Sequence, residues 1–270
     1  MKVLTSNVSK MFPISDAGLG GAAYTIEMLM GWMGGKERWR SMPWMVTFFF
    51  IHVVPIGVVS IVLVILQPVV VGSWCSVCLF TALVMLLTIP FAVDEVVAMG
   101  QFLKRSVREG KPLWRIFWVG GALDEVNDGQ RTPRYGAPVS KLVGPMVWGV
   151  TAPWNLVASA ALGIWLMCEP AAFGTQAGAA DSDHVVGALI TTVAVIGMAE
   201  VIRAGRFLNL LLGAWVMAAP WLLSGASTAA RWNDVIAGAL IIVLSIQRGP
   251  VRERYAGWDR LIVRPPRLTH

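Results

Sequence analysis

Long, continuously apolar blocks, separated by short basic segments, dominate this sequence of 270 residues. A helix needs about 20 apolar residues to cross the hydrocarbon core of a bilayer, and several of the blocks approach or exceed that length. The blocks do not alternate apolar and polar residues, as the strands of a membrane barrel do. The sequence therefore predicts an all-α, polytopic membrane bundle of about seven helices.

Composition agrees with a membrane protein. Hydrophobic residues make up 56% of the chain and charged residues only 14%, whereas soluble domains carry about 25% charged residues. The predicted spans are residues 17–34, 43–66, 75–97, 142–168, 185–202, 207–223 and 235–246.

The basic residues lie almost entirely between alternate pairs of spans. Nineteen of the 22 Lys and Arg residues fall in four segments, residues 35–42, 98–141, 203–206 and 247–270. Cytoplasmic loops of membrane proteins are enriched in Lys and Arg, so these segments are predicted to face the cytoplasm. The N-terminus is then extracytoplasmic and the C-terminus cytoplasmic. The net charge of +6 is explained by orientation, and no nucleic-acid partner is expected.

Residues 101–118 mix basic residues with large apolar ones. An amphipathic helix on anionic lipid and an ordinary cytoplasmic linker fit this pattern equally well.

An internal repeat fills the second half of the chain. Residues 162–170 match residues 212–220 at an offset of 50, and residues 186–190 match residues 237–241 at an offset of 51. Each unit is predicted to be a helical hairpin, in which Gly163 and Gly213 let the helices approach closely. With Asn209, Ala219-Pro220-Trp221 and Trp232-Asn233, residues 153–262 resemble the SPW-repeat family. That resemblance implies no particular chemistry.

The motif with the clearest chemical potential is Cys75-Ser76-Val77-Cys78, at the predicted extracytoplasmic start of a span. Two cysteines at this spacing can form a redox-active disulfide, and the positive end of the helix dipole favours a thiolate. Zinc binding and plain packing are the alternatives for such a pair. No metal is expected, because no second cysteine pair or histidine cluster accompanies it.

Several segments together resemble the vitamin K epoxide reductase family. They are Val3-Leu4-Thr5-Ser6, residues 14–21, Tyr24-Thr25 and a helical pair whose last helix opens with the C-x-x-C. The resemblance implies a membrane thiol–disulfide oxidoreductase whose cysteine pair reacts with a quinone, and whose electrons come from a thioredoxin-like dithiol protein.

Individual roles follow from the same resemblance. Cys78 would attack the quinone, Cys75 would exchange with the relay, and Ser6 matches the family's loop Ser/Thr. Asp16 stands where some relatives have a quinone-bonding Asn, and Tyr24 is a candidate for quinone binding. Ala82 replaces a Tyr that bonds the quinone, and an alanine side chain has no hydrogen-bonding group.

The family's first helix and its relay cysteine pair have no counterpart in these residues. The sequence begins directly after the position of a relay cysteine, so we expect either a misassigned start site, with a further span upstream, or a gene that was split or truncated.

The predicted organisation is a reductase-like module at residues 1–100, a basic segment at 101–141 and a repeat module with a basic tail at 142–270. The predicted function is quinone-linked thiol–disulfide oxidoreduction; the alternative is a non-catalytic structural or partner-binding membrane protein with a vestigial redox module. Transport is not indicated, since no run of buried charges is recognisable in the sequence. Glu27 and His52, inside spans, either pair or serve a function, and Cys168 is interpreted as a small apolar residue.

Overall fold

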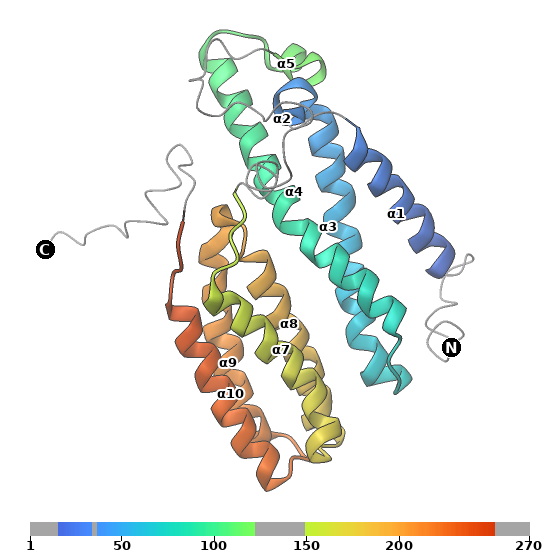
Figure 1. The fold of residues 1–270 in the computed structure, drawn as a ribbon, viewed down its shortest axis with the longest axis vertical. Helices are drawn as coiled ribbons and strands as arrows, with labels where there is room; N and C mark the ends of the chain where they lie inside the picture. Colours follow the sequence, from blue (N-terminus) through green and yellow to red (C-terminus); the bar gives the residue numbers. More distant parts are fainter. Residues whose placement is uncertain (1–15, 34–36, 122–148, 252–270) are drawn as a thin grey trace, which may run out of the picture.

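A computed structural model describes residues 16–33, 37–121 and 149–251, and these residues form two groups of helices lying side by side (Figure 1). The first group holds α1 (Asp16–Trp32), α2 (Arg38–Ser41), α3 (Pro43–Leu66), a π-helical turn at Gln67–Val71, α4 (Ser76–Arg108) and α5 (Leu113–Val119). The second holds α7 (Trp154–Phe173), α8 (Ala177–Ile196), η4 (Glu200–Phe207), α9 (Leu208–Leu222) and α10 (Thr228–Ile246). The all-α membrane fold is confirmed.

Six of the described helical segments are long and apolar enough to cross a membrane. They are Pro43–Val71, Ser76–Arg108, Trp154–Phe173, Ala177–Ile196, Glu200–Leu222 and Thr228–Ile246. The helix α1 has only 17 residues, several of them Gly or Ala, and is not among the six. The predicted count of seven is therefore not confirmed.

Helix α4 is much longer than the span predicted at residues 75–97. Its 33 residues correspond to about 50 Å, whereas the hydrocarbon core is about 30 Å thick. The C-terminal part, which includes Lys104, Arg105 and Arg108, therefore has the length to project beyond the bilayer. The predicted amphipathic segment at 101–118 is divided between the end of α4 and α5.

Aromatic and ionic contacts hold the helices of the first group together at the end where α4 finishes. Arg38 forms a two-point ion pair with Glu95 of α4 and donates to the Met30 carbonyl of α1 at 2.9 Å. Trp118 of α5 stacks on Trp44 of α3, with ring centroids 6.2 Å apart. This end, which also carries α5 and η4, is called the basic end below; the opposite end, with the turn at residues 67–75, is called the disulfide end.

The internal repeat folds as predicted, into two helical hairpins, α7–α8 and α9–α10. Helix α7 also contacts α10, and α8 contacts α9, so the hairpins close a four-helix bundle. Its buried core consists of three pairs of repeat-related residues: Leu166 with Val216, Val186 with Ala237, and Ile190 with Ile241. The two hairpins therefore use equivalent side chains to build one shared core.

Glycines allow the backbones within each hairpin to approach closely, as predicted. A Cβ added at Gly163 would lie 2.6 Å from the Gly187 carbonyl oxygen, and one added at Gly213 would lie 2.9 Å from that of Gly238. Real Cβ atoms almost never come this close to backbone oxygens. In a bilayer, where lipid is as apolar as the side chains, such close van der Waals packing is a main source of helix association.

Two helices of the bundle begin earlier than predicted. Helix α8 starts at Ala177 instead of residue 185, and α10 starts at Thr228 instead of residue 235. The first two turns of each helix combine small residues with polar ones, and this composition resembles loop sequence. The hydroxyl of Ser227 accepts a hydrogen bond from the Ala230 N–H at 3.2 Å and caps α10. Helix α7 begins at Trp154, and residues 142–148 of its predicted span lie outside the described residues.

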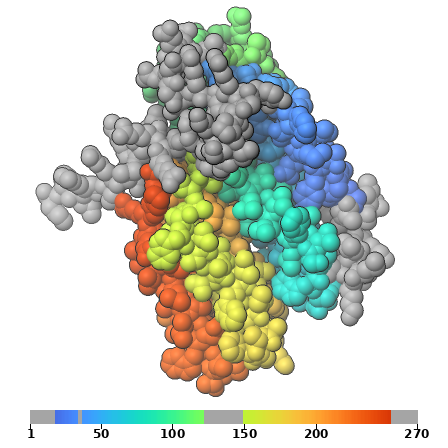
Figure 2. All heavy atoms as spheres, in the orientation of Figure 1, coloured from blue at the N-terminus to red at the C-terminus, as the bar shows by residue number. Residues whose placement is uncertain are grey.

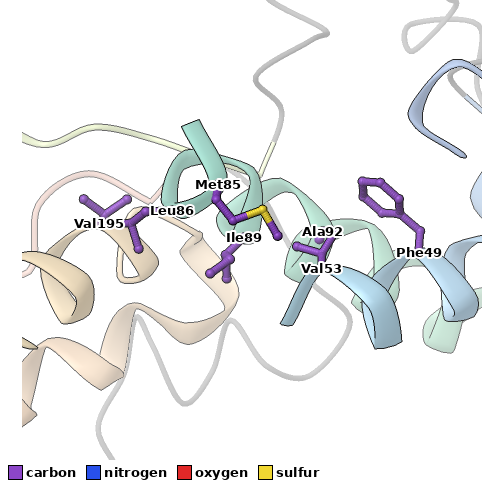
Figure 3. Close-up of a cluster of buried hydrophobic side chains, with 7 residues drawn as sticks. All are labelled: Phe49, Val53, Met85, Leu86, Ile89, Ala92 and Val195. Carbon is purple, nitrogen blue, oxygen red and sulfur yellow. The ribbon is translucent and has the colours of Figure 1, made fainter. Parts of the chain in front are cut away.

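The two groups of helices meet through an apolar cluster, shown in Figure 3. Val195 of α8 belongs to the same buried cluster as Leu86 and Ile89 of α4, and Phe49 and Val53 of α3 extend that cluster through the first group. In the space-filling view of Figure 2 the groups are offset along the long axis, and the repeat bundle extends further at one end.

We expect Gly163→Ala and Gly213→Ala each to lower the thermal stability of the detergent-solubilised protein, by about 1–3 kcal/mol, because each added methyl meets a backbone oxygen. Gly100→Ala is the control: no heavy atom lies within 4 Å of its added Cβ, and Ala is the better helix former. Equal melting temperatures for all three variants would contradict the close-packing account.

Candidate functional site

A compact turn at the disulfide end leads the chain from α3 into Cys75. Gln67 directly follows α3 and is almost fully buried, and its Oε1 accepts a hydrogen bond from the Cys75 N–H at 2.8 Å. Gly72 adopts the left-handed conformation that glycine tolerates best, with φ of +64°. The Ser73 N–H donates to the Gln67 carbonyl at 3.2 Å. Gln67 thus fixes the direction in which the chain enters α4.

Cys75 and Cys78 form a disulfide at the start of α4, with Cα atoms 5.3 Å apart. Cys75 is the N-cap residue, and its sulfur accepts a hydrogen bond from the Cys78 N–H at 3.3 Å. The Cys75 carbonyl accepts the N–H of Leu79 at 2.9 Å. In the reduced protein the same N–H group and the helix dipole favour a thiolate at Cys75, which is the form that exchanges disulfides.

Two cavities lie on opposite faces of α4. The Tyr24 cavity, about 450 Å³, is lined by α1, α3 and α4, and its wall includes Tyr24, Glu27, Phe80, Thr81 and Val84. The interface cavity, about 360 Å³, lies between the two groups of helices, and its wall includes Trp74, Leu79, Ala82, Met167, Cys168 and Thr192. Both volumes fall within the range of small-molecule sites, about 300–1,000 Å³.

The predicted site residues are only partly brought together. Tyr24 shares its cavity with Thr81, whose hydroxyl donates to the Cys78 carbonyl at 3.0 Å. Ala82 faces the other cavity. Asp16 is the first residue of α1, but its side chain, like the whole of Ser6, lies outside what the structure describes.

The remaining ionisable or thiol residues singled out in the spans have separate positions. Glu27 lines the Tyr24 cavity, and a ring nitrogen of His52 bonds the Ala23 carbonyl at 3.1 Å. Cys168 is a free, exposed cysteine on the wall of the interface cavity. Trp74, next to the disulfide, packs edge-on against His184 of α8, with ring centroids 5.7 Å apart.

Sequence reasoning missed two buried polar groups in the repeat bundle. Arg203 is fully buried at the basic end and donates to backbone carbonyls, among them Pro250 at 2.8 Å and Gly197 at 3.0 Å. Glu169, Asp183 and Asp234 form a buried carboxyl cluster towards the disulfide end. Asp183 was predicted to lie in a loop, so its burial beside Glu169 and Asp234 was not anticipated. The repeat could have pointed to this pair, because the offset of 51 places Asp183 and Asp234 at equivalent positions of the two hairpins.

Fold and site together define a helical membrane protein with a disulfide capping one membrane helix. Comparison with known families gives two matches. Residues 1–93 match the vitamin K epoxide reductase family, and residues 153–248 match the SPW repeat domain. The chain thus carries a vitamin K epoxide reductase family domain followed by an SPW repeat domain. No curated protein and no solved structure shows significant similarity to it.

We expect Gln67→Leu to loosen the turn before Cys75, because it removes the acceptor of a partly buried N–H at a cost of about 1–3 kcal/mol. Hydrogen–deuterium exchange of the peptide spanning residues 67–78 should become about tenfold faster or more. Gln67→Glu keeps an acceptor oxygen and serves as the control. If the leucine variant exchanges as slowly as the unmodified protein, Gln67 does not hold this turn.

Proposed function

We propose that this protein is a membrane thiol–disulfide oxidoreductase that couples the Cys75–Cys78 pair to a membrane quinone. The observation that carries the proposal is the disulfide at the N-terminus of α4, within a vitamin K epoxide reductase family domain. The proposed units are a redox module at residues 1–100, a connecting basic segment at 101–141 and a repeat module at 142–270.

The distribution of charge supports an extracytoplasmic position for the disulfide. All but one of the Lys and Arg residues in the described ranges belong to elements at the basic end. They are Arg38, Arg40, Lys104, Arg105, Arg108, Lys111, Arg115, Arg203, Arg206 and Arg248. The exception is Arg231 in α10. A basic end on the cytoplasmic side puts the disulfide on the side where disulfides persist.

The Tyr24 cavity is the proposed quinone site. Its wall is mainly apolar, as an isoprenoid quinone requires, and the Tyr24 hydroxyl is a donor for a quinone carbonyl. Thr81, on the same wall, bonds the Cys78 carbonyl and so connects the cavity to the redox pair. The interface cavity offers fewer hydrogen-bond donors to a quinone, because the hydroxyls of Thr191 and Thr192 on its wall already donate to backbone carbonyls.

The proposed cycle balances two electrons and two protons. The reduced Cys75 and Cys78 thiols give two electrons and two protons to the quinone. The quinone leaves as hydroquinone, and the Cys75–Cys78 disulfide forms. A dithiol of a thioredoxin-like protein then attacks the disulfide at Cys75, becomes oxidised itself and regenerates the two thiols. Two further residues remain proposed site residues by family resemblance. Asp16 stands at the position of a quinone-bonding Asn, and Ser6 matches the family's loop Ser/Thr.

The surface beside the disulfide suits a protein partner. Val77, between the two cysteines, is 68% exposed and Trp74 is 44% exposed. Trp is enriched at interface hot spots, and Val77 adds exposed apolar surface beside it. We propose that they form the contact for the dithiol protein.

Two observations favour a second function, a structural or partner-binding protein without turnover. Ala82 provides no hydrogen bond where the family has a tyrosine, and α4 packs against the repeat bundle through a buried apolar cluster. The redox state of the cysteines separates the two functions.

We expect Cys75 and Cys78 to be disulfide-bonded in quinone-replete cells and reduced in quinone-depleted cells. Acid quenching, maleimide labelling and intact mass measurement report this directly, and the Cys168→Ser variant removes labelling of the third thiol. Equal labelling of the pair under both conditions would support the structural function instead.

We expect Tyr24→Phe to slow quinone-dependent reoxidation of the pair by about tenfold, because the lost hydrogen bond is worth about 1–1.5 kcal/mol. Val84→Trp, which fills the Tyr24 cavity, should abolish reoxidation, whereas Ala82→Phe, which fills the interface cavity, should leave it unchanged. Stopped-flow reoxidation of the purified, reduced protein with a soluble quinone provides the measurement. The reverse pattern for Val84 and Ala82 would move the quinone site to the interface cavity.

A further inference from the structure

Three carboxyl groups from three helices converge inside the SPW repeat bundle, in a different group of helices from the proposed redox pair. Glu169 lies near the end of α7, Asp183 near the start of α8 and Asp234 near the start of α10. One oxygen of each lies within 4.8 Å of the corresponding oxygens of the other two.

The cluster combines a repeat-related pair with one additional carboxyl. Asp183 and Asp234 occupy equivalent positions of the two hairpins, so the fold brings two copies of one side chain together. Glu169 has no such counterpart, because Ala219 stands at the equivalent position. The third carboxyl is therefore an addition specific to the first hairpin, and it points towards the pair.

Each of these groups is buried and keeps an oxygen without a hydrogen-bond donor. The exposed fractions are 0% for Glu169, 3% for Asp183 and 1% for Asp234. Glu169 Oε1, Asp183 Oδ2 and Asp234 Oδ1 are all shielded from solvent and lack a partner. Asn233 donates to the other Glu169 oxygen at 2.6 Å. Buried polar atoms without partners are rare in native proteins, and a bound ion or water is one explanation for three of them converging at one point.

The negative charge of the cluster also needs compensation. The ion pairs Arg38–Glu95, Arg40–Glu37 and Lys111–Glu109 all lie outside the repeat bundle, and none of them reaches the three carboxyls. Carboxylates this close together in an apolar bundle cannot all stay ionised without positive charge beside them. A bound cation or shared protons can supply it.

Two tryptophans brace the surroundings of the cluster in the same way in both hairpins. Trp165 Nε1 donates to Asn233 Oδ1 at 3.1 Å, and the repeat-related Trp215 Nε1 donates to Ser182 Oγ at 3.0 Å. Asn233 and Ser182 directly precede Asp234 and Asp183 along the chain. This bracing holds the carboxyl-bearing turns in fixed positions before any ligand binds, as a preorganised site requires.

We propose that Glu169, Asp183 and Asp234 form a binding site for one divalent, oxygen-preferring cation, of the Ca²⁺ or Mn²⁺ class. Carboxylate oxygens are the ligands that these cations prefer. At metal–oxygen distances of about 2.2–2.5 Å, oxygens on one ion lie up to about 5 Å apart, which the cluster satisfies without rearrangement. The site ties α7, α8 and α10 together, so the bound ion stabilises the bundle.

The test is titration of the full-length protein in nanodiscs with Mn²⁺, followed by electron paramagnetic resonance of the free ion, with Ca²⁺ as competitor. We expect one saturable site per chain. Asp183→Asn, Asp234→Asn and Glu169→Gln should each weaken it by about tenfold or more. Asp181→Asn is the matched control, because Asp181 is exposed and lies two residues from Asp183 on the same helix; it should leave the affinity unchanged.

Thermal unfolding of the unmodified protein gives a second readout that needs no variant. Ca²⁺ or Mn²⁺ should raise the melting temperature and a chelator should lower it. Glu169 and Asp234 are close enough to interact through their carboxyl oxygens, so a shared proton is the competing ligand. No saturable Mn²⁺ binding, with a melting temperature indifferent to chelator, would overturn the proposal and assign the cluster to protons.

Discussion

The packing of α4 against helices on two sides is the interaction on which the rest of this structure depends. Its apolar side chains meet α3 on one side and Val195 of α8 on the other, in one buried cluster. The same helix begins with the disulfide and separates the Tyr24 cavity from the interface cavity. A change in the orientation of α4 would therefore alter the redox pair, both cavities and the junction between the two domains together.

The disulfide and the carboxyl cluster lie towards the same end of the molecule, on different domains. The contact between Trp74 and His184 joins them, because Trp74 adjoins Cys75 and His184 adjoins Asp183. The carboxyl cluster follows one physical rule of membrane proteins: polar groups are retained within spans only where protein surrounds them or supplies partners. At the opposite end Arg203 obeys that rule by donating to several backbone carbonyls.

The accuracy of the sequence predictions followed the strength of the local signal. The bounds of α3 were predicted correctly, because an unbroken apolar stretch begins at Pro43, and the glycine contacts followed from the repeat. The start of α8 was predicted eight residues too late, since Asp181, Asp183 and His184 resemble loop residues. The carboxylate of Asp183 is buried by residues of other helices, and its own neighbours along the chain give no sign of that.

By itself the sequence determined the helical membrane class, the repeat and the redox motif, because each depends on residues close together in the chain. The length of an apolar stretch, a repeat offset of 50 residues and a C-x-x-C motif can all be recognised along the chain without its fold. Only the tertiary structure decided that Tyr24 and Ala82 face different cavities and that Glu169 meets Asp183 and Asp234. These relations depend on the rotation of each helix about its axis, which is set by packing against other helices.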